Sequence, residues 1–499
     1  MTQNNMDQDN ENIPIKINNN TGNNDYKINS NDQPKNKYIK KKNIIVLLVI
    51  IIFIIIYIIN NNRTIAELNI KIERLESQLK NLNNEVVKKK IGVAFVTPHI
   101  YGNGIGRLLT ILTELLMKTG KFEVYLINEQ TTQLDFKYHK KVKREIQKKE
   151  EQIIRDFDEA NDIQIYILNN DVSDSIEIYQ SLGKKVVGIF HGVYLSCVFT
   201  NNPLIYRSWY RFKFFDSFIH IIPDDYYVYK NFGFNNTIFI PNLYTFNPNN
   251  ISSSKLEYKN VLMVARIDDS IKGGKYGILA MSQIVKIIPD AQLTIVAPNH
   301  PKDILDLINQ LKLENNVHIL GYTQNISQFY LNASVLLVTS VSESFPMVMN
   351  EGKAYGLPIV SFNIDYSPCF QNGVITVEMF DYKSMAIETV KLLNNYEYRK
   401  KMGEKAKLSL NMFNNNDTIK MWEELFISLL NGKEDYIKFQ EKIEKKYYNE
   451  TLAKNHLEKH YKYGQQFNEK HYKCHTFENF FKLDYINKIE DCFKQNNTL

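Results

Sequence analysis

The stretch Ser342-Glu-Ser-Phe-Pro-Met-Val-Met-Asn-Glu-Gly-Lys-Ala-Tyr-Gly-Leu-Pro358 decides our prediction of the fold. An apolar, β-branched run precedes it at 333–339 and another follows at 359–362, which is typical of buried parallel strands. Pro346 favours the first turn of a helix between these two strands. The stretch therefore predicts one strand–helix–strand unit of an α/β domain.

Two carboxylates belong to this unit. Glu343 is expected on the loop at the end of the first strand, and Glu351 about one and a half turns into the helix. The N-terminus of a helix presents unpaired N–H groups and a partial positive charge, which suit phosphate. The unit thus predicts a site for a phosphorylated, hydroxyl-rich ligand, whereas two surface glutamates on an ordinary α/β unit are the simpler interpretation.

The same stretch resembles the Glu-x7-Glu motif of retaining glycosyltransferases of family four, which have the two-domain GT-B fold. The resemblance implies transfer of a hexosyl group from a nucleotide diphosphate sugar to an acceptor hydroxyl. It implies that Glu343 is catalytic and holds the donor sugar, with a carboxylate nucleophile left open. It also implies that four residues bind the donor, namely Ser344, Phe345, Pro346 and Glu351.

The predicted architecture is α/β, with two Rossmann-like domains and a cleft between them. Alternating strand and helix patterns require parallel sheets. We place an acceptor domain at 91–243 and a nucleotide-sugar domain at 258–432, joined by a polar linker. The resemblance covers roughly 91–432. The helix around Met421–Phe426 is expected to pack back on the first domain.

A glycine-rich segment follows the first predicted strand, 91–97. Gly104 and Gly106 let the backbone approach a phosphate closely, although such turns are common in any βα unit. The segment is not a dinucleotide fingerprint, because Arg107 follows the last glycine. The resemblance implies that Gly104 and Gly106 bind the donor.

His191 follows the predicted strand 185–190. A lone histidine is usually structural, but one at the C-terminal end of a parallel strand points toward the edge where α/β sheets bind ligands. The resemblance implies that His191 faces the donor sugar, and we therefore predict it, with Glu343, as a catalytic residue. Ile240-Pro-Asn242 matches a family turn, except that Leu243 replaces its glycine.

Two cations follow the first strand of the second domain. Arg266 and Lys272 correspond to the pair that clamps the donor diphosphate in the resembled family, as a bidentate fork and a point charge. The spacing is one residue longer than usual, so Lys275 is an alternative to Lys272. The segment 363–378 departs from the family, which has a more glycine-rich loop there.

No metal ion and no cofactor beyond the donor are predicted. Asp156-Phe-Asp158 has the form of a metal motif, but it lies in the charged, helix-like stretch 137–160 and is better interpreted as a solvated helix face. The net charge of +6 comes largely from lysine-rich flanks, so nucleic acid is not an expected partner. The cysteines lack the spacing of a zinc site, and their pairing stays open: Cys197, Cys369, Cys474 and Cys492.

The N-terminal part predicts a membrane anchor. Residues 1–36 are polar and expected to be disordered. The segment 43–62 carries no charge over about 20 residues and contains an unbroken apolar run at 44–59, so it is predicted as a transmembrane helix. Lysines precede this run, so the body should lie in the lumen of the endoplasmic reticulum or Golgi as a type II protein. The heptad pattern in 63–90 predicts a coiled-coil stem and a homodimer.

Several features leave the function open. The tail 436–499 has no assigned role, and the acceptor is a glycan, lipid or protein. Two alternatives to a transferase are a GT-B sugar-nucleotide epimerase and an inactive, membrane-tethered scaffold that binds a nucleotide sugar. Glycosylation is expected at some of the sequons at Asn235, Asn250, Asn325, Asn332, Asn416, Asn449 and Asn496.

Overall fold

A computed structural model describes residues 46–57, 71–77, most of 90–448, and 451. Its internal gaps within 90–448 are 99, 101–103, 129–136, 138–139, 141, 147–149, 170–174, 193–211, 232–233, 268–271, 324, 342 and 364–372. The chain divides into two compact units, Met1–Lys88 and Lys89–Leu499. The four cysteines and the predicted disordered tail lie outside the described residues.

In the first unit, residues 46–57 and 71–77 are helical. The side chains of 46–57 are mostly exposed, as at Phe53, which is 67% exposed. Among the described segments, no helix combines the length and apolar character needed to cross a membrane. The predicted span 43–62 and the predicted stem 63–90 both extend beyond the described residues.

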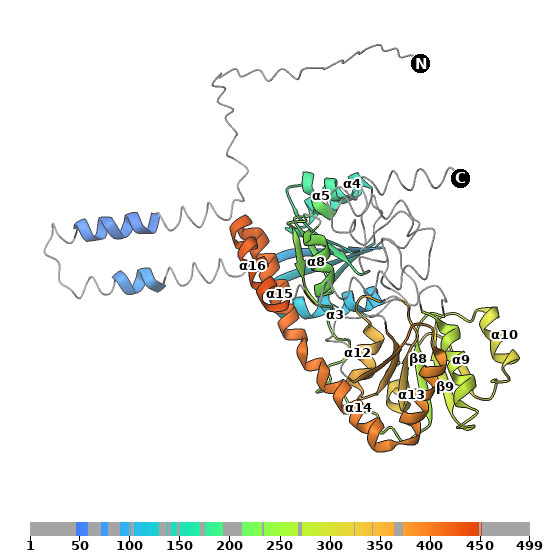
Figure 1. The fold of residues 1–499 in the computed structure, drawn as a ribbon. Coiled ribbons are helices and arrows are strands. Elements are labelled where there is room, and N and C mark those ends of the chain that lie inside the picture. Colours follow the sequence, from blue (N-terminus) through green and yellow to red (C-terminus); the bar gives the residue numbers. More distant parts are fainter. Residues whose placement is uncertain are drawn as a thin grey trace, which may run out of the picture. The chain divides into compact units, whose positions relative to one another are not determined.

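The second unit contains two parallel sheets (Figure 1). We call the first sheet with its helices the N-lobe, and the second sheet with its helices the C-lobe. The N-lobe sheet has seven strands in the order β3-β2-β1-β4-β5-β6-β7. Its strands are β1 Ile91–Thr97, β2 Phe122–Asn128, β3 Lys143–Ile146, β4 Ile165–Asn169, β5 Lys185–Phe190, β6 Ser217–His220 and β7 Thr237–Phe239. Its helices are α3 Gly104–Lys118, α4 Glu151–Ala160, α5 Ser175–Ser181 and α8 Pro223–Asn231, with the 3₁₀ turn Phe212–Phe214.

The C-lobe sheet has six strands in the order β10-β9-β8-β11-β12-β13. Its strands are β8 Asn260–Val264, β9 Gln292–Val296, β10 Val317–Leu320, β11 Val335–Val338, β12 Ile359–Phe362 and β13 Val374–Val377. Its helices are α9 Gly274–Ile284, α10 Lys302–Gln310, α11 Ser327–Asn332, α12 Met347–Ala354, α13 Tyr382–Asn394 and α14 Tyr396–Ser409, then the 3₁₀ turn Leu410–Met412. The predicted α/β fold with two Rossmann-like domains is confirmed.

A long helix joins the C-lobe to the N-lobe. In α15, Asn415–Asn431, Trp422 packs edge-on against Phe95 of β1, with ring centroids 6.0 Å apart. Phe426 packs in the same way on Phe122 of β2, at 5.5 Å. The segment predicted to pack back on the first domain therefore does so, because its apolar face completes the core of the N-lobe.

A second helix, α16, Lys433–Tyr447, covers the edge strand β7 and lies beside α8 (Figure 1). The Tyr436 hydroxyl donates to the Asn236 carbonyl at 2.8 Å, and Gln440 Nε2 donates to the Thr237 carbonyl at 2.8 Å. An exposed sheet edge is a template for unwanted pairing, and this helix shields it. The beginning of the tail that had no assigned role is thus part of the N-lobe.

The charged stretch 137–160 differs from the prediction of one helix-like segment. Residues 143–146 form strand β3 at the edge of the sheet, and among the described residues of this stretch only 151–160 are helical. Edge strands carry charged side chains, which hide the period-two pattern of a strand. The solvated-face interpretation holds for Asp156, which is exposed, but not for Asp158.

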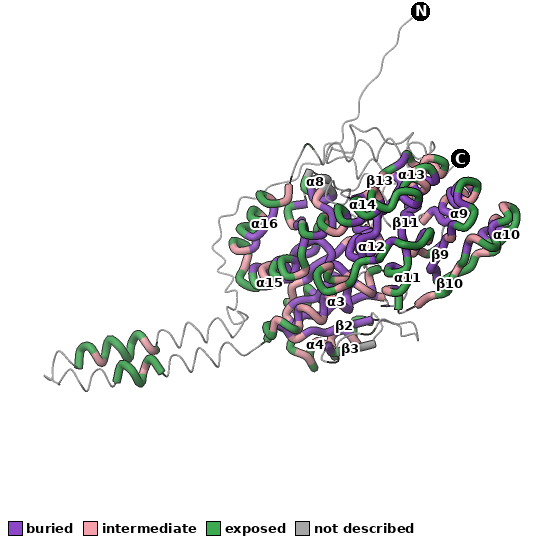
Figure 2. Tube along the Cα trace, turned by 90° about the horizontal axis from the view of Figure 1, so that it is seen from below, coloured by how far each residue is buried: buried purple, intermediate pink, exposed green. Residues whose placement is uncertain are grey.

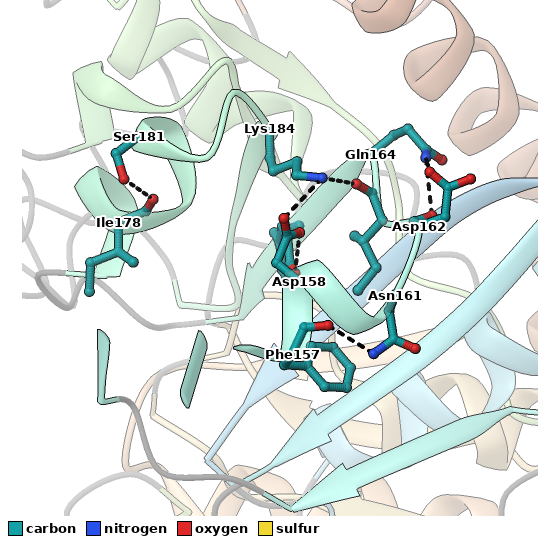
Figure 3. A network of polar contacts seen from close by, with 10 residues as sticks. Phe157, Asp158, Asn161, Asp162, Gln164, Ile178, Ser181 and Lys184 are labelled. Atoms are coloured by element: carbon teal, nitrogen blue, oxygen red, sulfur yellow. Dashed lines mark hydrogen bonds and ion pairs between the residues drawn. The ribbon is translucent and has the colours of Figure 1, made fainter. Parts of the chain in front are cut away.

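Asp158, the second acid of the Asp-x-Asp sequence, is bound within the lobe (Figure 3). Its carboxylate pairs with Lys184 Nζ at 3.1 Å and accepts a hydrogen bond from the Tyr166 hydroxyl at 2.9 Å. Burial and this carboxylate raise the pKa of Tyr166. Asp156, in contrast, accepts an exposed hydrogen bond from Gln152 at 2.7 Å.

Candidate active site

The loop that carries Glu343 and the helix α12 that follows it form one unit of the C-lobe. β11 ends at Val338, Pro346 caps α12, and Gly352 lets this helix lie on β11, since an added Cβ would meet Leu336 Cδ2 at 2.6 Å. Most of α12 is buried (Figure 2). Its N-terminal N–H groups and the Glu343 loop therefore share the C-terminal edge of the sheet.

Glu343 is held by a lysine of its own lobe. Its side chain is 16% exposed and forms an ion pair with Lys272 Nζ. The loop that carries Lys272 is held by the residue that follows β11, because Thr339 Oγ1 donates to the Lys272 carbonyl at 2.8 Å. Gly273 follows in the left-handed conformation, φ 59°, where an added Cβ would lie 2.3 Å from the Thr339 carbonyl oxygen.

The other predicted cations lie differently. Arg266 lies two residues after the end of β8 and is exposed, and it has no hydrogen bond or ion pair with another residue among those the structure describes. Residues 268–271, between the two cations, are outside the described range. The alternative lysine, Lys275, places its ammonium 5.3 Å from the centre of the Tyr276 ring. Lys272 is thus the lysine that the structure brings to Glu343.

Glu351 is buried and bonded from both lobes. Its carboxyl group is 3% exposed and accepts a hydrogen bond from the Tyr330 hydroxyl at 2.7 Å. Its other oxygen lies 3.1 Å from Arg107 Nη1, which comes from α3 of the N-lobe. Burial raises the pKa of Tyr330, and the adjacent carboxylate adds to this shift. The Arg107 guanidinium also lies over the Phe246 ring at 5.4 Å.

Arg107 is a site residue that the sequence analysis missed. In the sequence, Arg107 was used only as a reason to exclude a dinucleotide-binding fingerprint. Its position in the first turns of α3, next to the glycine segment, was the available signal, but nothing in the local pattern identified Glu351 as its partner.

His191 lies where the prediction placed it, directly after β5. The Oδ1 atom of Asn169 is 3.1 Å from its Nε2 atom, and its backbone carbonyl accepts a hydrogen bond from the Ser344 hydroxyl. Burial lowers the pKa of His191 to about 4, so the ring is neutral at pH 7. The Ser344 bond joins the acid loop of the C-lobe to the end of an N-lobe strand.

The two glycines of the N-lobe differ in their surroundings. The helix α3 begins at Gly104, and an added Cβ there would lie 3.6 Å from Met347 Cγ, at the start of α12. Gly106 is buried, and a Cβ there would lie 2.6 Å from the Ile100 backbone. Gly104 thus lies against the acid helix, while Gly106 has a packing reason to be glycine.

The remaining predicted residues support the loop. Phe345 is 4% exposed and its ring centre is 6.3 Å from that of Tyr244, in the segment joining the lobes. In the part of the chain that is described, no three His, Cys, Asp or Glu side chains are grouped so as to hold a metal ion. The site therefore contains two ion pairs, Glu343 with Lys272 and Glu351 with Arg107. The neutral imidazole of His191 and the N-terminus of α12 complete it.

This arrangement of an acid loop and an acid-bearing helix in a second parallel-sheet lobe agrees with one family. Residues 248–409 match the glycosyl transferases group 1. The resemblance on which the sequence prediction rests is confirmed. The matched residues include both acids and both cations of the C-lobe.

The curated relatives include proteins named as glycosyltransferases. An uncharacterized glycosyltransferase of Haemophilus influenzae is 31% identical over 202 residues, which are 39% of this chain and 56% of that protein. The N-acetyl-alpha-D-glucosaminyl L-malate synthase of Bacillus anthracis is 27% identical over 36% of this chain and 47% of its own length. The chain thus spans about half the length of these two relatives.

Solved structures share the two-lobe fold. Sucrose-phosphate synthase from Thermosynechococcus elongatus has a TM-score of 0.59 at 15% identity, over 69% of this chain and 100% of that one. An Anabaena protein crystallised with UDP and glucose has a TM-score of 0.57 at 14% identity, over 68% and 100%. These likenesses show the fold.

Proposed function

We propose that this protein is a retaining glycosyltransferase that moves a hexosyl group from a nucleotide diphosphate sugar to an acceptor hydroxyl. The observation that carries the proposal is the contact between Glu343 and Lys272 beside the N-terminus of α12, within the residues that match glycosyl transferases group 1. A relative named as a glycosyltransferase and the presence of UDP in a protein of the same fold support it.

The leaving diphosphate determines the chemistry that the site must supply. Its negative charge grows as the glycosidic bond breaks, so pre-placed positive groups lower the barrier. The α12 N–H groups and Lys272 lie at this edge, and the exposed Arg266 reaches the same side of the sheet from the end of β8. In this mechanism no metal ion is required for the leaving group.

The donor sugar and ribose bind to the two acids. Glu343 holds the sugar ring and releases Lys272 to the diphosphate when the donor arrives. Glu351 accepts the ribose hydroxyls, because each carboxylate oxygen has two lone pairs and Tyr330 and Arg107 use one on each. His191 faces the sugar, and closure of the lobes excludes water, which favours transfer over hydrolysis.

The proposed enzyme is membrane-anchored through 43–62 and dimerises through the stem 63–90, with its body in the Golgi or endoplasmic reticulum lumen. The run of apolar residues after a lysine cluster supports this orientation. Five of the sequon asparagines are exposed, as glycosylation requires, namely Asn235, Asn250, Asn325, Asn332 and Asn416. A mobility shift of the full chain on removing N-glycans from microsomes tests the orientation, and an unshifted chain contradicts it.

The decisive experiment measures turnover of a panel of UDP- and GDP-sugars. We expect wild-type protein to consume at least one donor and Glu343→Ala to lose this activity while keeping its circular dichroism and melting temperature. Glu397→Ala, at an exposed site in α14, is the matched control and should remain active. Full activity of Glu343→Ala would refute the assignment; a wild type that turns over none would favour an inactive scaffold, and a rearranged sugar nucleotide an epimerase.

A further inference from the structure

Asn169 ends strand β4 and is 1% exposed. Its Nδ2 group donates to the Val96 carbonyl at 3.1 Å, at the end of the neighbouring strand β1. Its Oδ1 atom is 3.1 Å from His191 Nε2, at the end of β5 on the other side. One buried amide therefore connects three consecutive strand ends of the N-lobe sheet.

The bond to Val96 fixes which way this amide points. A backbone carbonyl only accepts hydrogen bonds, so the NH2 group of Asn169 must face it and the amide oxygen must face the imidazole. A second carbonyl, that of Ile167, lies 3.4 Å from the same Nδ2 atom and favours the same orientation. An amide oxygen also only accepts, so Nε2 of His191 must carry the hydrogen.

The other nitrogen of the ring then has a defined character. A neutral imidazole has one N–H group, which leaves Nδ1 as an acceptor. The ring stays neutral at pH 7, because burial lowers the pKa of His191 to about 4. Such a nitrogen binds a hydroxyl donor and disfavours the oxygen of an ionised phosphate or carboxylate, which only accepts.

The backbone of the histidine is held as well. The Ser344 hydroxyl of the acid loop donates to the His191 carbonyl. The ring is therefore fixed by the N-lobe sheet, and the main chain by the loop that bears Glu343. Both constraints exist before any ligand binds, so no reorganisation is needed at that step.

We propose that Asn169 is a positioning residue that holds the His191 ring in its Nε2–H tautomer at the end of β5. That this ring faces the donor sugar rests on the proposed function, whereas the tautomer does not.

The tautomer is measured in the detergent-solubilised full chain labelled with ¹⁵N-histidine. A long-range proton–nitrogen correlation distinguishes a protonated nitrogen from a bare one, and His191→Gln assigns the signals. We expect a protonated Nε2 and a bare Nδ1 in the wild type. A protonated Nδ1, or averaged signals from two tautomers, would overturn the proposal whether or not the protein transfers sugar.

Asn169→Leu keeps the size of the side chain and removes its hydrogen bonds. We expect mixed tautomers in this variant and a fall in donor kcat/KM of about tenfold, which corresponds to one hydrogen bond of about 1.4 kcal/mol. The matched control is Asn236→Leu, since Asn236 donates to the Phe212 and Phe215 carbonyls at 2.9 and 2.8 Å from the opposite edge of the sheet.

The outcomes separate the two proposals. An unchanged Nε2–H tautomer in Asn169→Leu would show that Asn169 does not fix it and would refute the inference. The expected tautomers without turnover of any donor would instead refute the proposed function alone. Should Asn169→Leu not fold, the wild-type spectrum still decides which nitrogen carries the proton.

Discussion

The ion pair between Arg107 and Glu351 should stabilise the contact between the two lobes. Arg107→Met removes the guanidinium but keeps most of the aliphatic chain. Loss of one partner of a buried pair costs about 3–5 kcal/mol, because the other charge is left unpaired. Here Tyr330 still bonds the carboxylate at 2.7 Å and Arg107 is 25% exposed, so we expect a smaller loss, about 2–3 kcal/mol.

A double-mutant cycle isolates the pair. Glu351→Gln keeps the size of the side chain and loses its charge, and the double variant should be more stable than the sum of the single losses predicts. A coupling free energy of about 1–2 kcal/mol is expected, since one partner is buried and the other is a quarter exposed. Unlike a surface pair, this coupling should persist at high salt.

The assay is urea unfolding followed by the fluorescence of Trp422, which packs against Phe95 of the N-lobe. Trp209→Phe makes this indole the sole reporter. At a slope of about 2–3 kcal/mol/M, the Arg107→Met variant should lower the midpoint by about 1 M without a change in slope.

The control is a more exposed ion pair, which links the N-lobe to α15. Lys121 Nζ lies 2.8 Å from Glu423, and its side chain is 55% exposed. Lys121→Met should cost no more than about 1 kcal/mol, as surface pairs do. If Arg107→Met costs no more than this control, or if the cycle gives no coupling, burial of Glu351 does not make the pair strong and the reasoning fails.

Two further substitutions test the N-lobe core and the lysine loop. Neither ring nitrogen of His220 has a hydrogen-bond partner among the described residues, and burial lowers its pKa to about 3. The unfolded chain, with a pKa near 6.5, binds a proton that the folded chain excludes, so stability is lost as pH falls below about 6.5. Between pH 7 and 5 the loss from this group is about 2 kcal/mol, and His220→Phe should remove it in urea unfolding at the two pH values; an unchanged pH dependence contradicts this. Gly273→Ala forces a side chain into the left-handed conformation and against a carbonyl oxygen 2.3 Å away, so it should cost more than Gly183→Ala, which has φ 70° and open space. The Gly183 variant should lose about 1–2 kcal/mol from backbone strain alone, and equal melting temperatures would contradict the close approach at Gly273.

The central strands could be predicted from the sequence because their residues are apolar and buried on both faces. β5 and β12 have the predicted bounds, Lys185–Phe190 and Ile359–Phe362. Such runs depend on local composition and need no knowledge of the partner strand. The loop that carries Glu343 was predictable for the same reason, because the end of the buried strand before it determines where this loop begins.

Edge elements escaped prediction because they bury little. β3 consists of Lys, Arg, Glu and Ile, and at an edge such side chains need no apolar alternation. α16 is rich in lysine and glutamate, yet it buries Tyr436, Phe439 and Ile443 against the N-lobe. Three apolar residues among many charges also fit a solvated helix, so only the fold distinguishes the two.

Arg107 and Asn169 could not be identified for a different reason. Each acts through a residue on another element: Arg107 through Glu351 of the other lobe, and Asn169 through His191 of the adjacent strand. Sequence patterns report which residues share a helix face or a strand, but not which side chains meet after the chain has folded. Contacts between strand ends depend on sheet order, which is set by long-range packing.

The two acids of the site differ in the origin of their partners. Glu343 pairs with Lys272 of its own lobe, whereas Glu351 pairs with Arg107 of the other lobe. A ligand that takes over Glu343 therefore rearranges one lobe, but a ligand that competes for Glu351 also weakens a bond between lobes. Glu351 is both the proposed acceptor for the ribose hydroxyls and the partner of Arg107 in the other lobe. Nucleotide binding and the contact between the lobes are therefore linked at Glu351, and each must alter the free energy of the other.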